Sequence, residues 1–180
     1  MTLKPQDLVV GLSLTLPRYM GAAWTYAQLA DSLYLSDSEA NAAARRAGEA
    51  GLLAGGDGRR TKPRPVPGAL LEFIEHGVRY AFYAHPGERT RGTPTAHSAS
   101  PLAAEFAVAR EDFVVWPDAS GSTRGAAVEP LYPTVPDAAR ASRELYELLA
   151  LVDAVRIGRT RERARAIQEL RRRVQLDDRR

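Results

Sequence analysis

Thr25-Tyr26-Ala27-Gln28 and Ser36-Asp37-Ser38-Glu39 are the two stretches that decide the fold of this 180-residue chain. Each has the pattern of a capping box, in which a Ser or Thr accepts a hydrogen bond from the backbone N–H three residues later, and a Gln or Glu at that later position reaches back to the cap. Each stretch therefore predicts the start of a helix. Only Tyr34 and Leu35 separate the first predicted helix from the second cap, and two helices joined so closely predict a helix-turn-helix.

The second predicted helix has one face of small residues and one polar face. At about 100° per residue, the small residues form one arc, which is predicted to be buried against neighbouring helices: Ala40, Ala43, Ala44, Ala47, Ala50 and Gly51. The opposite arc is predicted to face solvent and holds Ser38, Glu39, Asn41, Ala42, Arg45, Arg46 and Glu49. An ordinary amphipathic helix with a solvated polar face would give the same pattern.

The polar arc carries side chains that suit the edges of DNA bases. Asn matches adenine and Arg matches guanine in the major groove. Asn41, Arg45 and Arg46, together with the neighbouring Ala42, are therefore candidates for base contacts. Ser36 and Ser38 lie at the helix N-terminus, where backbone N–H groups and the helix dipole favour a phosphate, so they are candidate phosphate contacts.

A basic segment follows this helix. Gly56-Asp57-Gly58 predicts a turn, and four cations follow within six residues: Arg59, Arg60, Lys62 and Arg64. A basic hairpin here would contact phosphates or enter the minor groove, whereas the alternative is a flexible basic linker. Pro63 and Pro65 cannot donate to a sheet ladder, so any strand in this segment should be short or at an edge.

Together these features resemble the bacterial winged-helix transcription regulators, in the broad sense that includes MarR-like proteins. The resemblance covers about residues 5–66: the capped helix from Thr25, the helix from Ser36, the exit Gly51-Leu52-Leu53 and the basic segment. It implies sequence-specific binding of duplex DNA, normally as a dimer on a palindrome. It says nothing about which operator is read.

The composition predicts a folded protein of the cytoplasm. Hydrophobic residues make up 44% of the chain, which is enough for a core. The absence of cysteine excludes disulfides and cysteine-based metal centres. No apolar run approaches the roughly 20 residues that span a bilayer, and the N-terminus lacks the features of a signal peptide. We therefore expect no membrane partner.

The net charge of +3 is unevenly distributed. Residues 156–180 contain ten Arg against two Glu and two Asp, a net charge of +6, so the remainder of the chain carries −3. This asymmetry indicates a surface for nucleic acid or an acidic partner near the C-terminus.

The rest of the sequence predicts an α+β protein in three segments. Residues 1–66 form the winged helix-turn-helix, with a first helix over 5–16 that Pro17 ends and with Trp24 in the core. Residues 67–136 form a small α+β segment, with a helix over 68–78 and strands over 79–83, 113–116 and 126–129, the last two joined by a hairpin-like turn at 120–125. Residues 137–180 are helical, with one helix over 137–157 that Gly158 ends and another from Thr160. The terminal helices either dimerise or simply cover their own domain.

The sequence gives little sign of catalysis. His76, His85 and His97 lack the spacing of a helical zinc site, and the common nucleophile and phosphate-loop motifs are absent. We expect no enzyme activity, no cofactor and no metal. Arg91, His97 and Arg124 are candidates for a ligand pocket, in which the two arginines could bind an anion. The alternatives are a satisfied loop histidine and salt bridges of the arginines to Glu88, Glu105 or Glu129.

These patterns favour an operator-binding transcription regulator, expected to be a repressor, whose partners are double-stranded DNA and a second copy of itself. The alternative is a protein-interaction module, such as the antitoxin or regulatory partner of a neighbouring toxin or defence protein. Its contact would be made by the middle or C-terminal segment.

Overall fold

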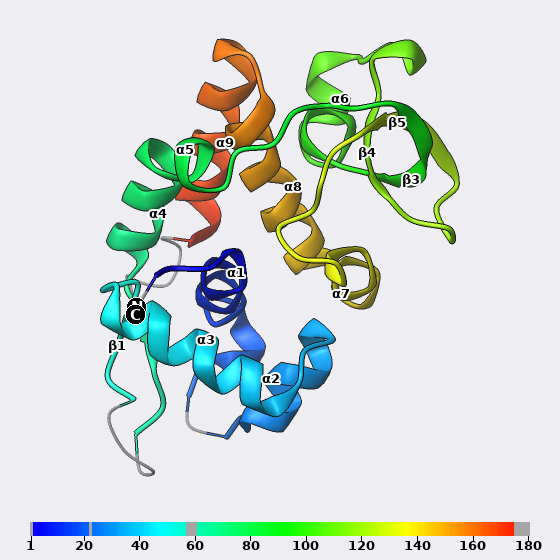
Figure 1. Ribbon diagram of the computed structural model, residues 1–180. Coiled ribbons are helices and arrows are strands. Elements are labelled where there is room, and N and C mark those ends of the chain that lie inside the picture. The colour runs from blue at the N-terminus through cyan, green and yellow to red at the C-terminus, as the bar shows by residue number, and fades with distance from the viewer. Residues whose placement is uncertain (1, 22, 57–60, 175–180) are drawn as a thin grey trace.

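The protein has a mixed α+β fold, and the computed structural model describes residues 2–21, 23–56 and 61–174. Helices from both ends of the chain pack together in the centre (Figure 1). A β-hairpin lies at one end of the molecule and a three-stranded barrel at the other, at the lower left and upper right of Figure 1.

The N-terminal region is helical, and its second and third helices begin where the capping patterns predict. Its elements are α1 (Pro5–Ser13), the 3₁₀ turn η1 (Pro17–Tyr19), α2 (Tyr26–Leu33) and α3 (Asp37–Glu49). Thr25 forms the reciprocal capping box with Gln28. The second box forms only in part: Ser36 accepts from the backbone N–H of Glu39 at 3.2 Å, but the Glu39 carboxylate accepts from Arg46 in place of the Ser36 backbone. Tyr34 adopts a left-handed conformation with φ 54°, which turns the chain sharply between α2 and α3.

The two ends of this region differ from the prediction. Helix α1 ends at Ser13 and not at Leu16, because the chain turns before Pro17 through hydrogen bonds from Thr15 and Leu16 to backbone carbonyls of α1. Helix α3 ends at Glu49, so Ala50 and Gly51 are exposed and not part of its packed face. Gly51 has φ +76°, which lets the chain leave the helix.

A short antiparallel hairpin follows α3. Strand β1 (Leu53–Ala54) pairs with β2 (Arg64–Pro65), with Leu53 opposite Pro65. Each strand has two residues, as the prolines predict. Residues 57–60 within this hairpin are outside the described residues.

The middle of the chain contains helices and a small barrel: α4 (Pro67–His76), α5 (Val78–Ala81), β3 (Arg89–Pro94), η2 (Ala96–Ser98), α6 (Ala103–Phe106), η3 (Arg110–Asp112), β4 (Val114–Pro117) and β5 (Thr123–Ala127). The strand predicted over 79–83 is wrong, because most of that stretch is helical. Phe82 packs edge-on against Phe73 of α4, with ring centroids 5.7 Å apart, and so folds the segment back on α4.

The barrel closes in a way that the sequence pattern did not indicate. β3 is antiparallel to both β4 and β5, whereas β4 and β5 are parallel, so the hairpin predicted around 120–125 is wrong. Strand β5 also begins at Thr123, inside the predicted turn. Glycine allows this close crossing: a Cβ added to Gly121 would lie 2.2 Å from the carbonyl carbon of Gly92, and one on Gly125 would lie 2.4 Å from the carbonyl oxygen of Phe113.

Three helices complete the chain: α7 (Val135–Ala141), α8 (Arg143–Ile157) and α9 (Thr160–Val174). The single helix predicted over 137–157 is therefore two helices, because Ser142 leaves the helical conformation and caps α8 by accepting from the backbone N–H of Leu145 at 3.3 Å. Gly158 ends α8 as predicted.

One contiguous hydrophobic core runs from Leu8 in α1 to Val174 in α9. Trp24 is buried in it, as expected, and makes edge-to-face contacts with Tyr19 and Tyr26. The N-terminal helices are also joined to the later part of the chain by a hydrogen bond of 2.9 Å from the Tyr132 hydroxyl to the backbone oxygen of Leu33. The division into three segments at 66 and 136 stays a prediction from the sequence.

A buried polar cluster fastens the barrel to α8. The carboxylate of Asp153, which is 1% exposed, accepts from the Thr95 hydroxyl at 2.8 Å and from the Trp116 indole at 2.5 Å. Its other oxygen accepts from Arg156 at 2.5 Å, and Arg156 also donates to the backbone oxygen of Phe82. Asp153 therefore accepts all three of these hydrogen bonds, from Thr95, Trp116 and Arg156.

Candidate nucleic-acid interface

Helix α3 is held against α1 by a buried ion pair. Arg46 is 8% exposed and its guanidinium donates to both oxygens of Asp7, at 2.7–3.0 Å, while Asp7 is fully buried. Arg46 also donates to Glu39 at 2.7 Å. The hydrogen bonds to Asp7 raise the pKa of Arg46 above its ordinary value and keep it charged.

The prediction that Arg46 faces solvent is therefore wrong, and its guanidinium is not available to a base. The reason is that α3 presents part of its polar arc, as well as its alanine face, to α1. Glu39 is half-buried for the same reason, because its carboxylate turns toward Arg46. In the sequence, Asp7 is the signal that could have indicated a buried partner for Arg46, since it is a lone carboxylate beside Leu8 and Val9 in a predicted apolar helix.

The remaining polar residues of α3 form an exposed surface. Ser38, Asn41 and Arg45 are exposed and Ala42 is half-exposed, as predicted. A cavity of about 780 Å³ lies between this helix and the hairpin segment. Its walls are Asn41, Ala44, Arg45 and Gly48 on one side and Tyr26, Gly55, Gly56, Thr61, Lys62 and Pro63 on the other.

Lys62 is oriented in this cavity by aromatic rings. Its Nζ lies 4.7 Å from the ring centroid of Trp24 and 5.0 Å from that of Tyr26. Cation–π contacts at such distances stabilise an ammonium group by about 0.5–1 kcal/mol near a surface. The contacts place a fixed positive charge on the wall that faces Asn41 and Arg45. Neither Trp24 nor Tyr26 was predicted to have this role.

Ser36, Ser38 and Arg64, which were also predicted to contact DNA, do not line this cavity. Ser36 and Ser38 are exposed at the N-terminus of α3, with their hydroxyl oxygens 3.0 Å apart, and Ser36 also caps the helix. Arg64 is exposed on β2. Arg59 and Arg60 lie outside the described residues.

The second predicted site, Arg91 with His97 and Arg124, is only partly brought together. Arg91 and Arg124 are direct partners across the β3–β5 ladder. His97 instead has Nε2 at 3.1 Å from the backbone oxygen of Asp112, and Nδ1 at 3.7 Å from the carboxylate of Glu162 on α9. The histidine therefore belongs to the contact between η2, η3 and α9.

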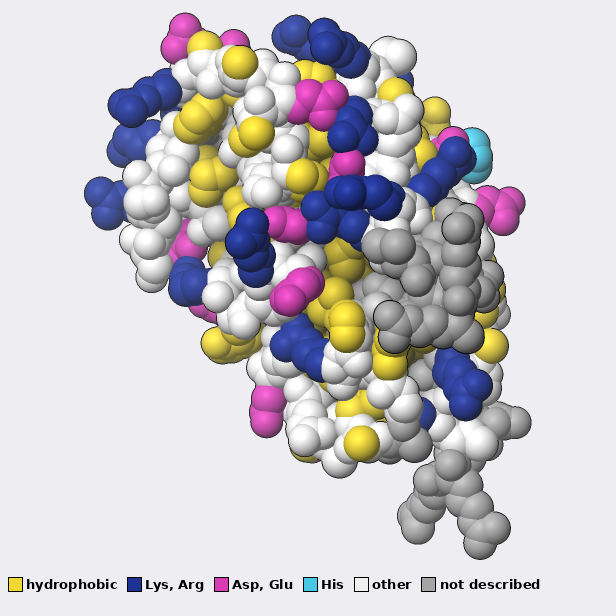
Figure 2. All heavy atoms as spheres, turned by 180° about the vertical axis from the view of Figure 1, so that it is seen from behind, with side chains coloured by type: hydrophobic (Ala, Val, Ile, Leu, Met, Phe, Trp, Pro, Cys, Tyr) yellow, Lys and Arg dark blue, Asp and Glu magenta, His cyan; other side chains and the backbone are white. Residues whose placement is uncertain are grey.

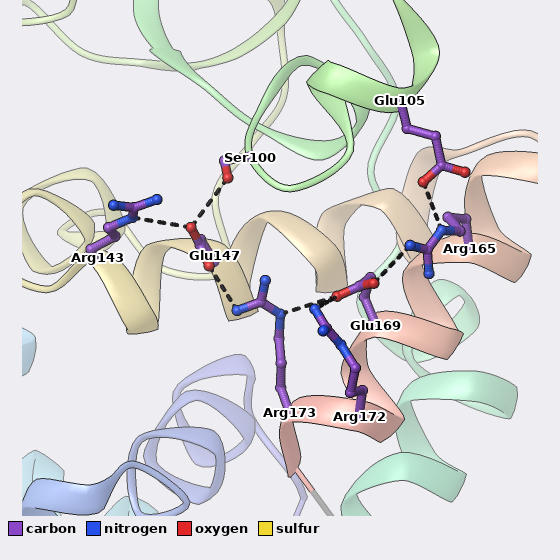
Figure 3. A network of polar contacts seen from close by, with 8 residues as sticks. All are labelled: Ser100, Glu105, Arg143, Glu147, Arg165, Glu169, Arg172 and Arg173. Atoms are coloured by element: carbon purple, nitrogen blue, oxygen red, sulfur yellow. Dashed lines mark hydrogen bonds and ion pairs between the residues drawn. The ribbon is translucent and has the colours of Figure 1, made fainter. Parts of the chain in front are cut away.

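Most of the C-terminal arginines near α8 are engaged within the molecule (Figure 3). Glu169 accepts from Arg165 at 2.8 Å and from Arg172 at 2.7 Å, and Glu147 accepts from Arg173 at 2.7 Å and from Arg143 at 3.2 Å. Arg165 also pairs with Glu105, and Arg171 with Glu75. On the back of the molecule, cationic and acidic side chains are correspondingly interspersed (Figure 2). Arg165, Arg171 and Arg173 thus join α9 to other parts of the chain through Glu105, Glu75 and Glu147.

The ion pairs of Glu147 and Glu169 predict that the stability of the fold depends on pH. Burial alone would raise the pKa of Glu147 and of Glu169, but the hydrogen bonds and charges of the arginines outweigh it and hold both values below the ordinary 4.5. A lowered pKa in the folded state stabilises it above pH 4.5, and this stabilisation is lost as the pH falls through the lowered values. Urea unfolding between neutral pH and about pH 3 should show this loss. The Glu147→Gln/Glu169→Gln variant should be less stable at neutral pH and lose less on acidification; an unchanged pH dependence would contradict this assignment.

Two kinds of feature are absent from the described part of the chain. Across residues 2–21, 23–56 and 61–174, no three His, Cys, Asp or Glu side chains are grouped so that they could hold a metal ion. In the same residues, no helix is both long enough and apolar enough to cross a bilayer.

Comparisons of the chain with protein-family models, with curated protein sequences and with solved structures gave no match. The resemblance to winged-helix regulators therefore rests on the sequence alone and stays a prediction.

Proposed function

We propose that this chain is a transcription regulator that binds duplex DNA through an N-terminal winged helix-turn-helix. In this proposal α3 is the recognition helix and the segment from β1 to β2 is the wing. The observation that carries it is the shared cavity between them. Asn41 and Arg45 line it from the helix and Lys62 lines it from the hairpin.

The chemistry of these two walls suits the two kinds of contact that DNA recognition needs. Asn and Arg side chains on an exposed helix can read base edges in the major groove. A lysine and an exposed Arg64 beside them can contact the phosphates that fix the register of the protein on the duplex. Ser36 and Ser38 would add phosphate contacts at the helix N-terminus. Arg59 and Arg60 stay candidates for wing contacts on the sequence alone.

The mode of action follows the family that the sequence resembles. We propose a homodimer that binds a palindromic operator and represses transcription in the cytoplasm. The two recognition helices of such a dimer would enter successive major grooves, about 34–36 Å apart. Dimer contacts would come from parts of the C-terminal helices that the core leaves exposed.

Replacing Arg45 with alanine is expected to weaken operator binding by about 1–3 kcal/mol and to relax specificity at one base pair. The measurement is a fluorescence anisotropy titration with DNA from upstream of the protein's own gene, in the presence of unrelated competitor DNA and over a salt series. Arg159→Ala is the control, because Arg159 is also an exposed arginine but lies between α8 and α9.

This titration tests whether α3 reads a specific operator sequence. Tight, competitor-resistant binding that Arg45→Ala loses and Arg159→Ala keeps would support an operator-reading helix. Weak binding that is equal for every duplex, or an equal loss in both variants, would contradict it. Binding should also fall steeply with salt, since phosphate contacts release counterions.

A second candidate function, a protein-interaction module, has an observation in its favour. Tyr80 and Tyr83 are 73% and 70% exposed, on α5 and just after it. Exposed tyrosines are enriched at the centres of protein interfaces. A toxin or defence protein held on this face would make the chain its antitoxin or regulatory partner. The salt series separates the two functions, because an apolar interface should depend little on salt.

A further inference from the structure

The geometry points to a second binding site, on the β3–β4–β5 barrel, which we infer to take the phosphate of a nucleotide. A cavity of about 370 Å³ opens there and is lined by Arg89, Arg110, Phe113, Ser122, Thr123 and Arg124. This site is independent of the proposed DNA surface, because the barrel and the hairpin lie at opposite ends of the molecule (Figure 1).

The cavity concentrates positive charge that the described residues do not neutralise. Three of its six lining residues are arginines and none is acidic. Within residues 2–21, 23–56 and 61–174, neither Arg110 nor Arg124 uses its guanidinium in a hydrogen bond or an ion pair. Glu111 and Asp112 are exposed next to Arg110, but neither lines the cavity. Cationic side chains are also visible along the barrel at the upper left of Figure 2.

The strand register adds an electrostatic reason for an anion. Arg91 and Arg124 are direct partners in the antiparallel β3–β5 ladder, so their side chains leave the same face of the sheet. Like charges directly opposite each other destabilise a ladder. Both residues are exposed, which lets the two guanidinium groups separate in water. Arg124 lines the cavity, so an anion bound there would offset this repulsion.

Arg89 makes the site rigid. Its guanidinium donates to the backbone oxygens of Glu111 at 2.5 Å, of Arg110 at 3.2 Å and of Arg124 at 3.2 Å. These bonds tie η3 to β5 and so fix the backbones from which Arg110 and Arg124 extend. Preorganised cationic groups lose less freedom when a ligand binds, and therefore bind it more tightly.

The other lining residues narrow the ligand to a nucleotide. Arginine presents a planar fork that matches phosphate oxygens, and the hydroxyls of Ser122 and Thr123 can donate to the same oxygens. Phe113 is half-buried in the wall and offers an aromatic ring on which a base can stack. The volume lies in the range of about 300–1,000 Å³ that is usual for small-molecule sites.

Isothermal titration of the full chain with ADP, with pyrophosphate and with a duplex of unrelated sequence would test this site. Wild-type protein should bind ADP, and Arg110→Ala and Arg124→Ala should each weaken binding about tenfold or more. Arg159→Ala is the control and should bind as wild type does. Circular dichroism and the thermal midpoint should be unchanged in all variants, because the three arginines are exposed and their guanidinium groups make no hydrogen bond or ion pair among the described residues.

Three results of this titration would contradict a nucleotide site on the barrel. No binding of ADP by the wild type, or equal binding by the wild type and both barrel variants, would remove the site. Pyrophosphate binding as tightly as ADP would remove the stacking role of Phe113 and with it the assignment to a nucleotide. Displacement of ADP by the duplex would instead make the barrel part of a nucleic-acid surface.

Discussion

The Arg46→Ala variant is expected to lose about 3–5 kcal/mol of unfolding free energy, the usual cost of removing one partner from a buried ion pair. The large effect arises because the fully buried carboxyl group of Asp7 would lose the guanidinium that donates to both of its oxygens. Domains of this size are stable by only about 5–15 kcal/mol, so a large fraction of the total would be lost. Urea unfolding followed by circular dichroism measures the difference directly.

Arg45→Ala is the matched control, because it removes the same side chain one position away. Arg45 is exposed, so its replacement should change stability by no more than about 0.5 kcal/mol. The pair of variants therefore separates two roles: Arg46 holds α3 in place, whereas Arg45 is proposed to read DNA. A loss of stability that is similar in both variants would contradict this division.

A double variant tests whether the pair acts as a unit. Replacing both partners by apolar residues, as in Asp7→Leu/Arg46→Met, removes the isolated charge as well as the bond. It should therefore be less damaging than the sum of the two single changes, with a coupling energy of about 1–3 kcal/mol. Strict additivity would show that the two side chains contribute separately.

The elements that the sequence predicted well are those set by local interactions. Thr25 and Ser36 accept from backbone N–H groups three positions away, so a short pattern is enough to predict where α2 and α3 begin. The short hairpin strands and the end of α8 at Gly158 also follow from single residues with a strong backbone preference. The exposure of Asn41 and Arg45 followed from helical periodicity.

The features that the sequence did not predict depend on contacts between distant residues. Helical periodicity places Arg46 on the exposed arc of α3. Arg46 is buried because it pairs with Asp7, 39 positions earlier in the chain. The parallel pairing of β4 and β5 depends on β3, which closes the barrel around them. The sequence suggested Arg124 for an anion pocket but not Arg89, which lies 35 positions earlier and joins it only in the folded barrel.

Replacing Asp153 should have an effect as large as replacing Arg46. In Asp153→Ala, the Thr95 hydroxyl and the Trp116 indole lose a buried acceptor, and Arg156 loses its counter-ion. The expected loss is about 3–5 kcal/mol of unfolding free energy. Asp153→Asn should also be damaging, by about 1–3 kcal/mol, because its amide must turn an NH₂ group toward one of the donors. Asp137→Asn is the control, since Asp137 is about half exposed on α7 and should change little.

The same variant also tests whether the chain folds as one unit. The core is contiguous from Leu8 to Val174, and Asp153 lies where the barrel meets α8. If the three sequence segments depend on one another, Asp153→Ala should lower the midpoint of a single unfolding transition, seen alike by circular dichroism and by tryptophan fluorescence. Trp116 reports the barrel and Trp24 the N-terminal helices, so a Trp24→Phe background isolates the barrel signal. Two separate transitions would mean that the barrel unfolds by itself, and α3 could then keep its proposed DNA-binding surface without it.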